Sequence, residues 1–471
     1  MATRRTVPAG SLALALAASM LTAFAPADQA QDRANERARF NQPQEEGLSE
    51  ADPRVTIAVI DGATNPYHGF FHEGSEIYPD GAPSAVTPEV LDEFGIGPGQ
   101  IVSLTRTGDF DEDFAADEEQ FDEIGHGQPY WFEGTNVIGI SFGDTDGERF
   151  RPEDDSATAH GVGTTAAALR ANPEAIVISV EGLAVSGGDA LEEAETWSFT
   201  HDAVDLVSTS YGTPAGEPDV LGGFGNLTAS YEGVVEHGKH HFGAVANAPT
   251  PSPVDPTGGP WWSIGVSGYE EGESEGRQML SGSYADFVGD FTQTLPYCRA
   301  CTDGEQSVGG TSFATPAAAG VFSSVLLEAR RAAGHGGGIV TEGVARPLMV
   351  QGEGIELTNW QLRRALEDSA VYPQAADWDP TADAPWGLTS TPALDPAPYL
   401  TFGWGVVTAD PEHDVVGETL AHAGVGDEPT RDNADACSYM TLNIQLRQTY
   451  WNDLEPGSDS SGTDEDPYQY C

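Results

Sequence analysis

Short runs of apolar, often β-branched residues recur between positions 55 and 267. The first is Val55–Ile60, which ends in Asp61-Gly62. A continuous apolar run of this length is typical of a strand buried on both faces of a parallel sheet. Similar runs follow at residues 136–140, 175–180, 205–210, 242–246 and 263–267, with stretches rich in Ala, Glu and Leu between several of them. This alternation predicts an α/β fold, in which helices cover both faces of a parallel sheet.

Two segments interrupt the alternation. Residues 69–134 hold the acidic run Asp109–Phe114 within a stretch punctuated by Gly and Pro, which indicates an acidic insertion. The chain after residue 412 ends in the acidic, Gly- and Ser-rich run Glu455–Asp466, a composition typical of a solvated, poorly ordered end. We therefore expect one large domain over 53–412 and an acidic C-terminal tail over 413–471.

The N-terminus has the composition of an export signal. Arg4-Arg5 precede an uncharged apolar run over 11–25, which contains small residues suited to cleavage at Ala23–Ala25. The run is shorter than the roughly 20 residues that span a membrane, and no second candidate follows it. We predict a signal peptide over 1–27, a polar linker over 28–52, and a secreted, extracellular protein without a membrane partner.

The charge balance is strongly acidic. The chain has 75 Asp and Glu against 20 Lys and Arg, a formal net charge of −55, and its one lysine is Lys239. Such a surface repels nucleic acid and anionic membranes, which excludes both as partners. We interpret the acidity as an adaptation to salty or cation-rich surroundings rather than as a binding site.

The four cysteines predict disulfides, because an exported protein meets an oxidising environment. Cys298 pairs with Cys301 and Cys437 with Cys471, or another pairing joins the tail to the main domain. Cys298-Arg-Ala-Cys301 could also form half of a zinc site, but the chain has no second CxxC segment to complete one.

A candidate nucleophile lies in the segment Gly309-Gly-Thr-Ser-Phe-Ala-Thr-Pro316, which precedes a long helical pattern reaching Arg331. The glycines allow a sharp turn that leaves Ser312 exposed at the start of the helix. The free N–H groups and the dipole of a helix N-terminus suit an anionic intermediate. The alternative is a Ser or Thr that only caps an Ala-rich helix.

Gly310-Thr-Ser-Phe-Ala-Thr-Pro316 resembles GTSxATP, the serine signature of the subtilisin-like serine proteases, also called subtilases or peptidase family S8. The resemblance implies a subtilisin-like α/β domain over 53–412 and a serine endopeptidase. The other signatures then follow in the order Asp, His, Ser, which excludes an α/β-hydrolase.

The resemblance also identifies candidate partners for Ser312. Asp61 ends the first apolar run, with Gly62-Ala63 where the family has Ser/Thr-Gly, and His68 follows it at the family's spacing. His160 opens a small-residue helix in which Gly161-Val-Gly163 replaces the usual Gly-Thr-His. His160 lies 99 positions after Asp61, which exceeds the family's usual separation, and the acidic insertion accounts for the difference.

Four other histidines compete with His160, namely His126, His237, His240 and His241. None of them precedes an Ala-rich helix, and we expect them at the surface.

The resemblance assigns an oxyanion donor and a substrate-binding strand. Asn247 follows an apolar run, as the family's oxyanion asparagine does, although Ala248 replaces the expected glycine and a turn asparagine is the alternative. The segment Ser210-Tyr211-Gly212 resembles the strand that pairs with the substrate backbone. Residues 357–366 and 402–407 resemble the closing helix and final strand of the domain.

The implied reaction is peptide-bond hydrolysis through an Asp61–His160–Ser312 triad and an acyl-enzyme. The chemistry needs no cofactor, while the carboxylates of the insertion suggest calcium as a structural ion. We expect protein or peptide substrates and a monomer. The alternative from another class is a catalytically inactive secreted module of the same fold that binds peptides.

Overall fold

The structure is a computed structural model, and it describes most of the chain between residues 53 and 451. The described ranges are 53–143, 158–183, 188–211, 227–245, 247, 257–269, 285–333, 349–350, 356–371, 403–426, 428–430, 440–441, 443–445, 447–448 and 451. The predicted signal peptide and linker, Gly212, Cys437, Cys471 and the run 455–466 lie outside them.

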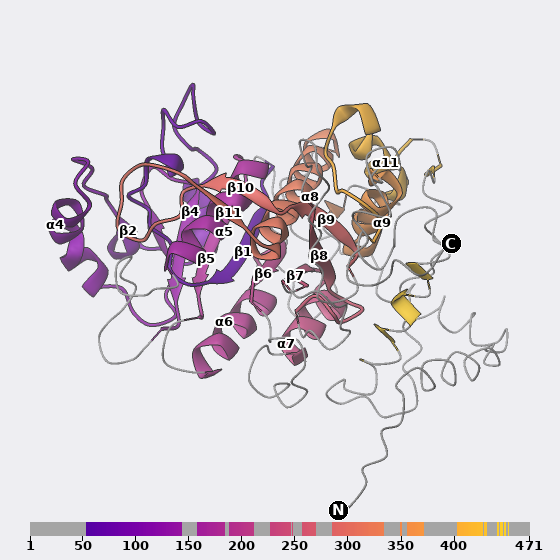
Figure 1. The fold of residues 1–471 in the computed structure, drawn as a ribbon, viewed down its shortest axis with the longest axis horizontal. Helices are drawn as coiled ribbons and strands as arrows, with labels where there is room; N and C mark the ends of the chain where they lie inside the picture. The colour runs from indigo at the N-terminus through magenta and orange to yellow at the C-terminus, as the bar shows by residue number, and fades with distance from the viewer. Residues whose placement is uncertain are drawn as a thin grey trace, which may run out of the picture.

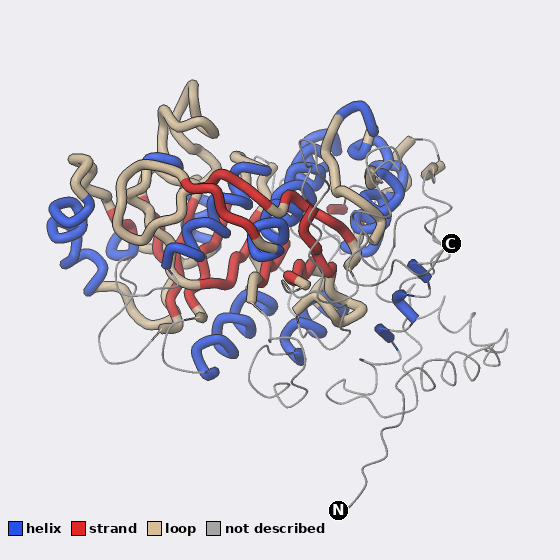
Figure 2. The backbone as a smooth tube through the Cα atoms, in the orientation of Figure 1, coloured by secondary structure: helices blue, strands red, loops and turns tan. Residues whose placement is uncertain are grey.

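A nine-stranded sheet forms the centre of the molecule (Figures 1 and 2), in the order β2-β3-β4-β5-β1-β6-β7-β8-β9. Its pairings are parallel except that of β3 with β4. The strands are β1 (Thr56–Asp61), β2 (Ile101–Val102), β3 (Tyr130–Phe132), β4 (Val137–Ser141), β5 (Ile176–Glu181), β6 (Leu206–Thr209), β7 (His240–Ala244), β8 (Ile264–Tyr269) and β9 (Phe287–Asp290).

The apolar runs form buried strands, as predicted. In β1, Ile57 and Val59 join one core cluster, while Ala58 and Ile60 join the cluster on the opposite face. Successive side chains of a strand point to opposite faces, so a strand covered on both sides must be apolar throughout.

Helices cover both faces, as expected. On one face α5 (Thr158–Ala171) and α8 (Thr311–Ala333) pack against each other and the sheet. On the other face lie α6 (Gly188–Thr200) and α7 (Leu227–Tyr231) (Figure 1). The remaining helices are α3 (Pro88–Glu93), α4 (Phe110–Asp122), α9 (Asn359–Ser369) and α11 (Val415–His422), with short helical turns η2 (Gly69–Phe71), η3 (Pro98–Gln100), η5 (Glu232–Glu236) and η8 (Pro411–His413).

Two small ribbons complete the described structure. Strands β10 (Thr292–Leu295) and β11 (Gln306–Gly309) form an antiparallel pair, and so do β12 (Met349–Val350) and β13 (Glu356–Leu357). The expected closing helix is α9, whereas the expected final strand is reduced to isolated bridges of Val406 with Val288 and Val371. Among the described residues, α8 is long and apolar enough to cross a membrane, but most of it is buried in the protein interior.

The insertion is part of the sheet. Its strands β2 and β3 extend the sheet beyond β4, and phenylalanines of α4 pack into the same core as α5 and α8. The buried carboxylates of Asp113 and Asp117 accept hydrogen bonds from Thr107 and Thr105, from both the backbone and the hydroxyl of each. These acidic residues therefore fix the loop before α4 in place.

The segment after residue 412 is not only a solvated tail. Helix α11 packs against α8 and α9, and Met440 and Trp451 are fully buried. Arg447 is also fully buried and donates to both oxygens of Asp286 at 2.8 and 2.9 Å. The expected boundary at 412 is therefore wrong, because these later residues complete the core.

Two of the competing histidines are not at the surface. His240 and His241 lie in β7, an inner strand of the sheet, and both are buried. His241 bridges the hydroxyls of Thr209 and Ser263 at 2.8 and 2.7 Å. Burial lowers the pKa of each imidazole to about 3, so both are neutral. The position of the two histidines inside a strand determines their burial, although imidazole is polar.

Candidate active site

The predicted site residues gather where β1, β6 and β7 end and where α5 and α8 begin. Asp61 is the last residue of β1, His160 lies in the first turn of α5, and Ser312 is the second residue of α8. Parallel strands place their carboxyl ends at one edge of the sheet, so residues distant in sequence meet there.

Asp61 and His160 form a direct pair. Nδ1 of His160 lies 2.8 and 2.9 Å from the two carboxylate oxygens of Asp61, which is only 1% exposed. The Gly62 N–H and the Thr164 hydroxyl also donate to this carboxylate, at 2.7 and 3.1 Å. An aspartate in this position accepts the proton on Nδ1, which leaves Nε2 of His160 as the basic nitrogen.

The charge of Asp61 tunes the imidazole. Attraction to this carboxylate raises the pKa of His160 above its usual 6.5, although burial of the ring opposes the rise. The side chain of His160 remains 28% exposed, so its outer edge faces solvent. Such an imidazole is suited to take and return a proton near neutral pH.

The start of α5 approaches β1 closely enough to require glycine. A Cβ on Gly161 would lie 2.2 Å from the Gly62 carbonyl oxygen and 2.5 Å from that of Ala63. Only hydrogen at this position allows the helix to bring His160 against Asp61. Thr164, one turn later, then reaches the same carboxylate, a contact that the sequence motif did not reveal.

Ser312 and Ser210 are joined by two reciprocal hydrogen bonds. The Ser210 hydroxyl donates to the Ser312 carbonyl at 2.7 Å, and the Ser312 hydroxyl donates to the Ser210 carbonyl at 3.2 Å. Pro316 stands four residues after Ser312 and has no N–H, so it cannot form the usual helical bond to the Ser312 carbonyl. Because Pro316 cannot donate to it, the Ser312 carbonyl accepts a hydrogen bond from the Ser210 hydroxyl instead.

Asn247 contacts Thr311, the residue before Ser312. Its Oδ1 accepts from the backbone N–H and the hydroxyl of Thr311 at 2.9 and 3.1 Å. The side-chain NH2 group is then the part of Asn247 that can donate elsewhere. The Ser312 N–H lies in the first turn of α8, where backbone donors have no intrahelical partner. The Asn247 NH2 group and the Ser312 N–H are therefore both suited to bind an oxyanion.

Aromatic rings fill the space that Gly163 leaves open. The Phe313 ring lies 5.3 Å from the His160 ring and 5.8 Å from that of Tyr297. A Cβ on Gly163 would come within 2.8 Å of Phe313 and 3.0 Å of Tyr297. The departure from the family pattern at Gly163 thus makes room for a ring that packs against the candidate base.

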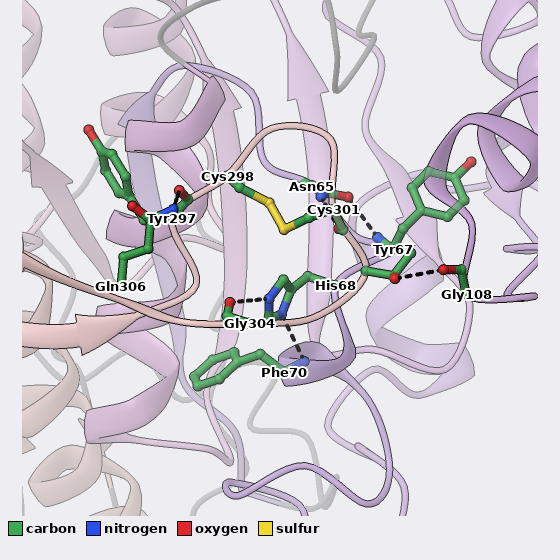
Figure 3. Close-up of a disulfide and its surroundings, with 11 residues drawn as sticks. Asn65, Tyr67, His68, Phe70, Gly108, Tyr297, Cys298, Cys301, Gly304 and Gln306 are labelled. Carbon is green, nitrogen blue, oxygen red and sulfur yellow. Dashed lines mark hydrogen bonds between the residues drawn. A yellow bond between two sulfur atoms is a disulfide. The ribbon is translucent and has the colours of Figure 1, made fainter.

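A disulfide loop supports Tyr297 and the chain after Asp61 (Figure 3). Cys298 and Cys301 are bonded, as predicted. Asn65 donates to the Cys301 carbonyl at 2.7 Å, and Nε2 of His68 lies 2.8 Å from the Gly304 carbonyl. His68 therefore connects two loops and does not enter the triad.

The expected substrate-binding residues occupy different environments. Ser210 follows β6 and contacts Ser312 directly. The Tyr211 side chain is buried and donates to Glu195 at 2.5 Å, so only its backbone is available to a substrate. Gly212 lies outside the described residues.

No family model and no curated protein matches the sequence. Solved structures that are similar to the chain at low identity include three proteases. The prenylagaramide maturation protease PagA is 14% identical over 79% of this chain and 95% of its own, with a TM-score of 0.38. A lanthipeptide protease is 13% identical over 78% and 89%, with a TM-score of 0.42. A cold adapted subtilisin-like serine proteinase is 17% identical over 71% and 89%, with a TM-score of 0.36.

Proposed function

We propose that this chain is a secreted serine endopeptidase of the subtilisin-like kind, acting on extended segments of proteins or peptides. One observation carries the proposal: Nδ1 of His160 lies 2.8 Å from the buried Asp61, beside helix α8, whose first turn holds Ser312. The hydrogen bond orients the imidazole and stabilises its charged form during proton transfer.

The proposed reaction proceeds through an acyl-enzyme. Ser312 Oγ attacks the peptide carbonyl while Nε2 of His160 takes the hydroxyl proton, which then passes to the leaving amine. The oxyanion lies between the Ser312 N–H and the Asn247 NH2 group. A water molecule, deprotonated by His160, hydrolyses the ester and restores Ser312. Apart from the substrate and this water molecule, the steps use only groups of this chain.

The substrate is proposed to bind as an added strand beside Ser210 and the backbone that follows it. Strand addition satisfies backbone groups of both chains and needs no particular side chain from the enzyme. The buried position of the Tyr211 side chain is consistent with such backbone pairing.

An inactive peptide-binding module is the second candidate, and one contact favours it. Ser312 Oγ donates to the Ser210 carbonyl at 3.2 Å rather than to His160. Catalysis requires the Ser312 side chain to turn toward Nε2. Catalytic hydrogen bonds often form fully only in the substrate complex, so this contact is compatible with the protease.

Peptide cleavage separates the two candidates. Wild type, incubated with a mixed peptide pool, should generate new termini detected by mass spectrometry, and Ser312→Ala should generate none. Ser307→Ala is the matched control, because Ser307 is exposed on β11, where it pairs with Thr294 of β10. Folded wild type that binds peptides without cutting them would support the inactive module.

A further inference from the structure

A second group of ionisable side chains lies between α9 and α11, apart from the triad. Asp368 stands near the end of α9, and Glu418 and His422 are one turn apart on α11. The two helices pack against each other (Figure 1). A helix presents residues four positions apart on one face, so Glu418 and His422 face α9 together.

The donor atoms of these residues converge. One ligand atom from each of the three lies within 4.8 Å of the others. Nε2 of His422 is 3.4 Å from Asp368 Oδ2 and 3.8 Å from Glu418 Oε1. Tetrahedral bonds of about 2.1 Å to one ion would place ligand atoms about 3.4 Å apart. The two distances from His422 are therefore close to those between the ligand atoms of a metal site.

Two of the converging atoms lack hydrogen bonds. Within the part of the chain that the structure describes, neither Glu418 Oε1 nor His422 Nε2 has a hydrogen-bond partner, although both atoms are buried. Buried polar atoms normally have one. The other oxygen of Glu418 accepts from the Thr430 hydroxyl at 3.0 Å, which orients the carboxylate toward His422.

Arg364 is a cation that competes with a metal ion for Asp368. Arg364 Nε donates to Asp368 Oδ2 at 3.2 Å. A protonated His422 could also form an ion pair with Asp368 or Glu418, but its one Nε2 proton can serve only one of them well. A metal ion would engage His422 and both carboxylates at once.

We propose that Asp368, Glu418 and His422 bind one divalent transition-metal ion. One imidazole nitrogen with two carboxylate oxygens suits zinc, cobalt or manganese, whereas calcium prefers six to eight oxygen ligands. The ion would join α11, which belongs to the segment after residue 412, to α9 of the main domain. Its role is structural, and it does not depend on the proposed protease activity.

Metal binding can be measured directly on the full chain after treatment with a chelator. Titration with Zn2+ by calorimetry, and with Co2+ by absorption, should detect one site that Glu418→Gln and His422→Ala weaken by about 100-fold or more. His413→Ala is the matched control, because His413 is exposed on the neighbouring turn. His160→Ala should also retain the site, which separates it from the triad.

Thermal unfolding gives a second readout. Zn2+ should raise the Tm of wild type and of the His413 variant, because a ligand that binds only the folded state stabilises it. The Glu418→Gln variant, which keeps the side-chain shape, should fold but show no such rise. Wild type that binds neither ion, or His422→Ala that binds as tightly as wild type, would overturn the proposal. A Tm that depends on His422 but not on metal would assign the cluster to an ion pair.

Discussion

At the scale of single residues, the Asp61–His160 pair determines what the site can do. The motif predicted both residues, and the structure adds the donors around them. The Thr164 hydroxyl and the Gly62 N–H donate hydrogen bonds to the Asp61 carboxylate, which also accepts from His160 Nδ1. The sequence could not predict Thr164 because its role depends on how α5 lies against β1.

Asp61→Asn should change the pH dependence as well as the rate. The charge of Asp61 raises the pKa of His160, so the acid limb of kcat/KM should lie above pH 6.5 in wild type. Without that charge the pKa of His160 falls, and the acid limb should move to lower pH. The rate should drop by about 10⁴-fold, because the amide also favours the wrong tautomer. An unchanged acid limb would mean that another group titrates.

Thr164→Val tests the support of the carboxylate. The substitution removes one hydroxyl donor at nearly constant volume. A hydrogen bond to a charged group contributes about 1.5–3 kcal/mol, so kcat should fall by roughly 10- to 100-fold. Thr200→Val, on the exposed end of α6, is the control and should leave kcat unchanged.

At the scale of elements, apolar runs predicted the strands that are buried on both faces. Strands β2 and β3 were missed because they are short and lie within an acidic, Gly-rich segment. His240 and His241 were assigned to the surface, yet β7 buries them with neutral rings. Polarity predicts exposure poorly where hydroxyls and carbonyls from neighbouring segments supply partners.

Gly161→Ala should disrupt the junction of α5 with β1. The new Cβ would lie 2.2 Å from a backbone oxygen, so the helix itself must move. We expect a loss of about 1–3 kcal/mol in the free energy of unfolding and a larger fall in activity, because His160 moves with the helix. Urea unfolding measures the first effect. Gly99→Ala, where nothing lies within 4 Å of the new methyl group, should have neither effect.

At the scale of the whole molecule, the chain after residue 412 closes the domain. Arg447 donates to Asp286 and to the carbonyls of Gly259 and Pro260 at 2.8 and 2.6 Å. Its hydrogen-bond partners lie 161 to 189 residues earlier in the sequence, so composition alone suggested a solvated tail. The fold class was predictable from local pattern, whereas this closure depends on distant contacts.

Arg447→Ala should destabilise the whole domain. Removal of one member of a buried ion pair costs about 3–5 kcal/mol when the partner is left unpaired. Arg363 still pairs with Asp286 at 2.9 Å, so the loss should lie toward the lower end of that range. The urea midpoint should fall accordingly, while Arg299→Ala, at an exposed position in the disulfide loop, should leave it unchanged. Equal midpoints for wild type and the Arg447 variant would show that this segment contributes little to stability.

The most direct test of the central claim is the site of labelling by a fluorophosphonate, which reacts with activated serines. Mass spectrometry of the labelled chain should find the adduct on Ser312 in wild type and in His126→Ala, whose histidine is exposed and paired with Glu193. It should find none in His160→Ala or Ser312→Ala. Folded wild type with no adduct, or with an adduct on another serine, would contradict the account.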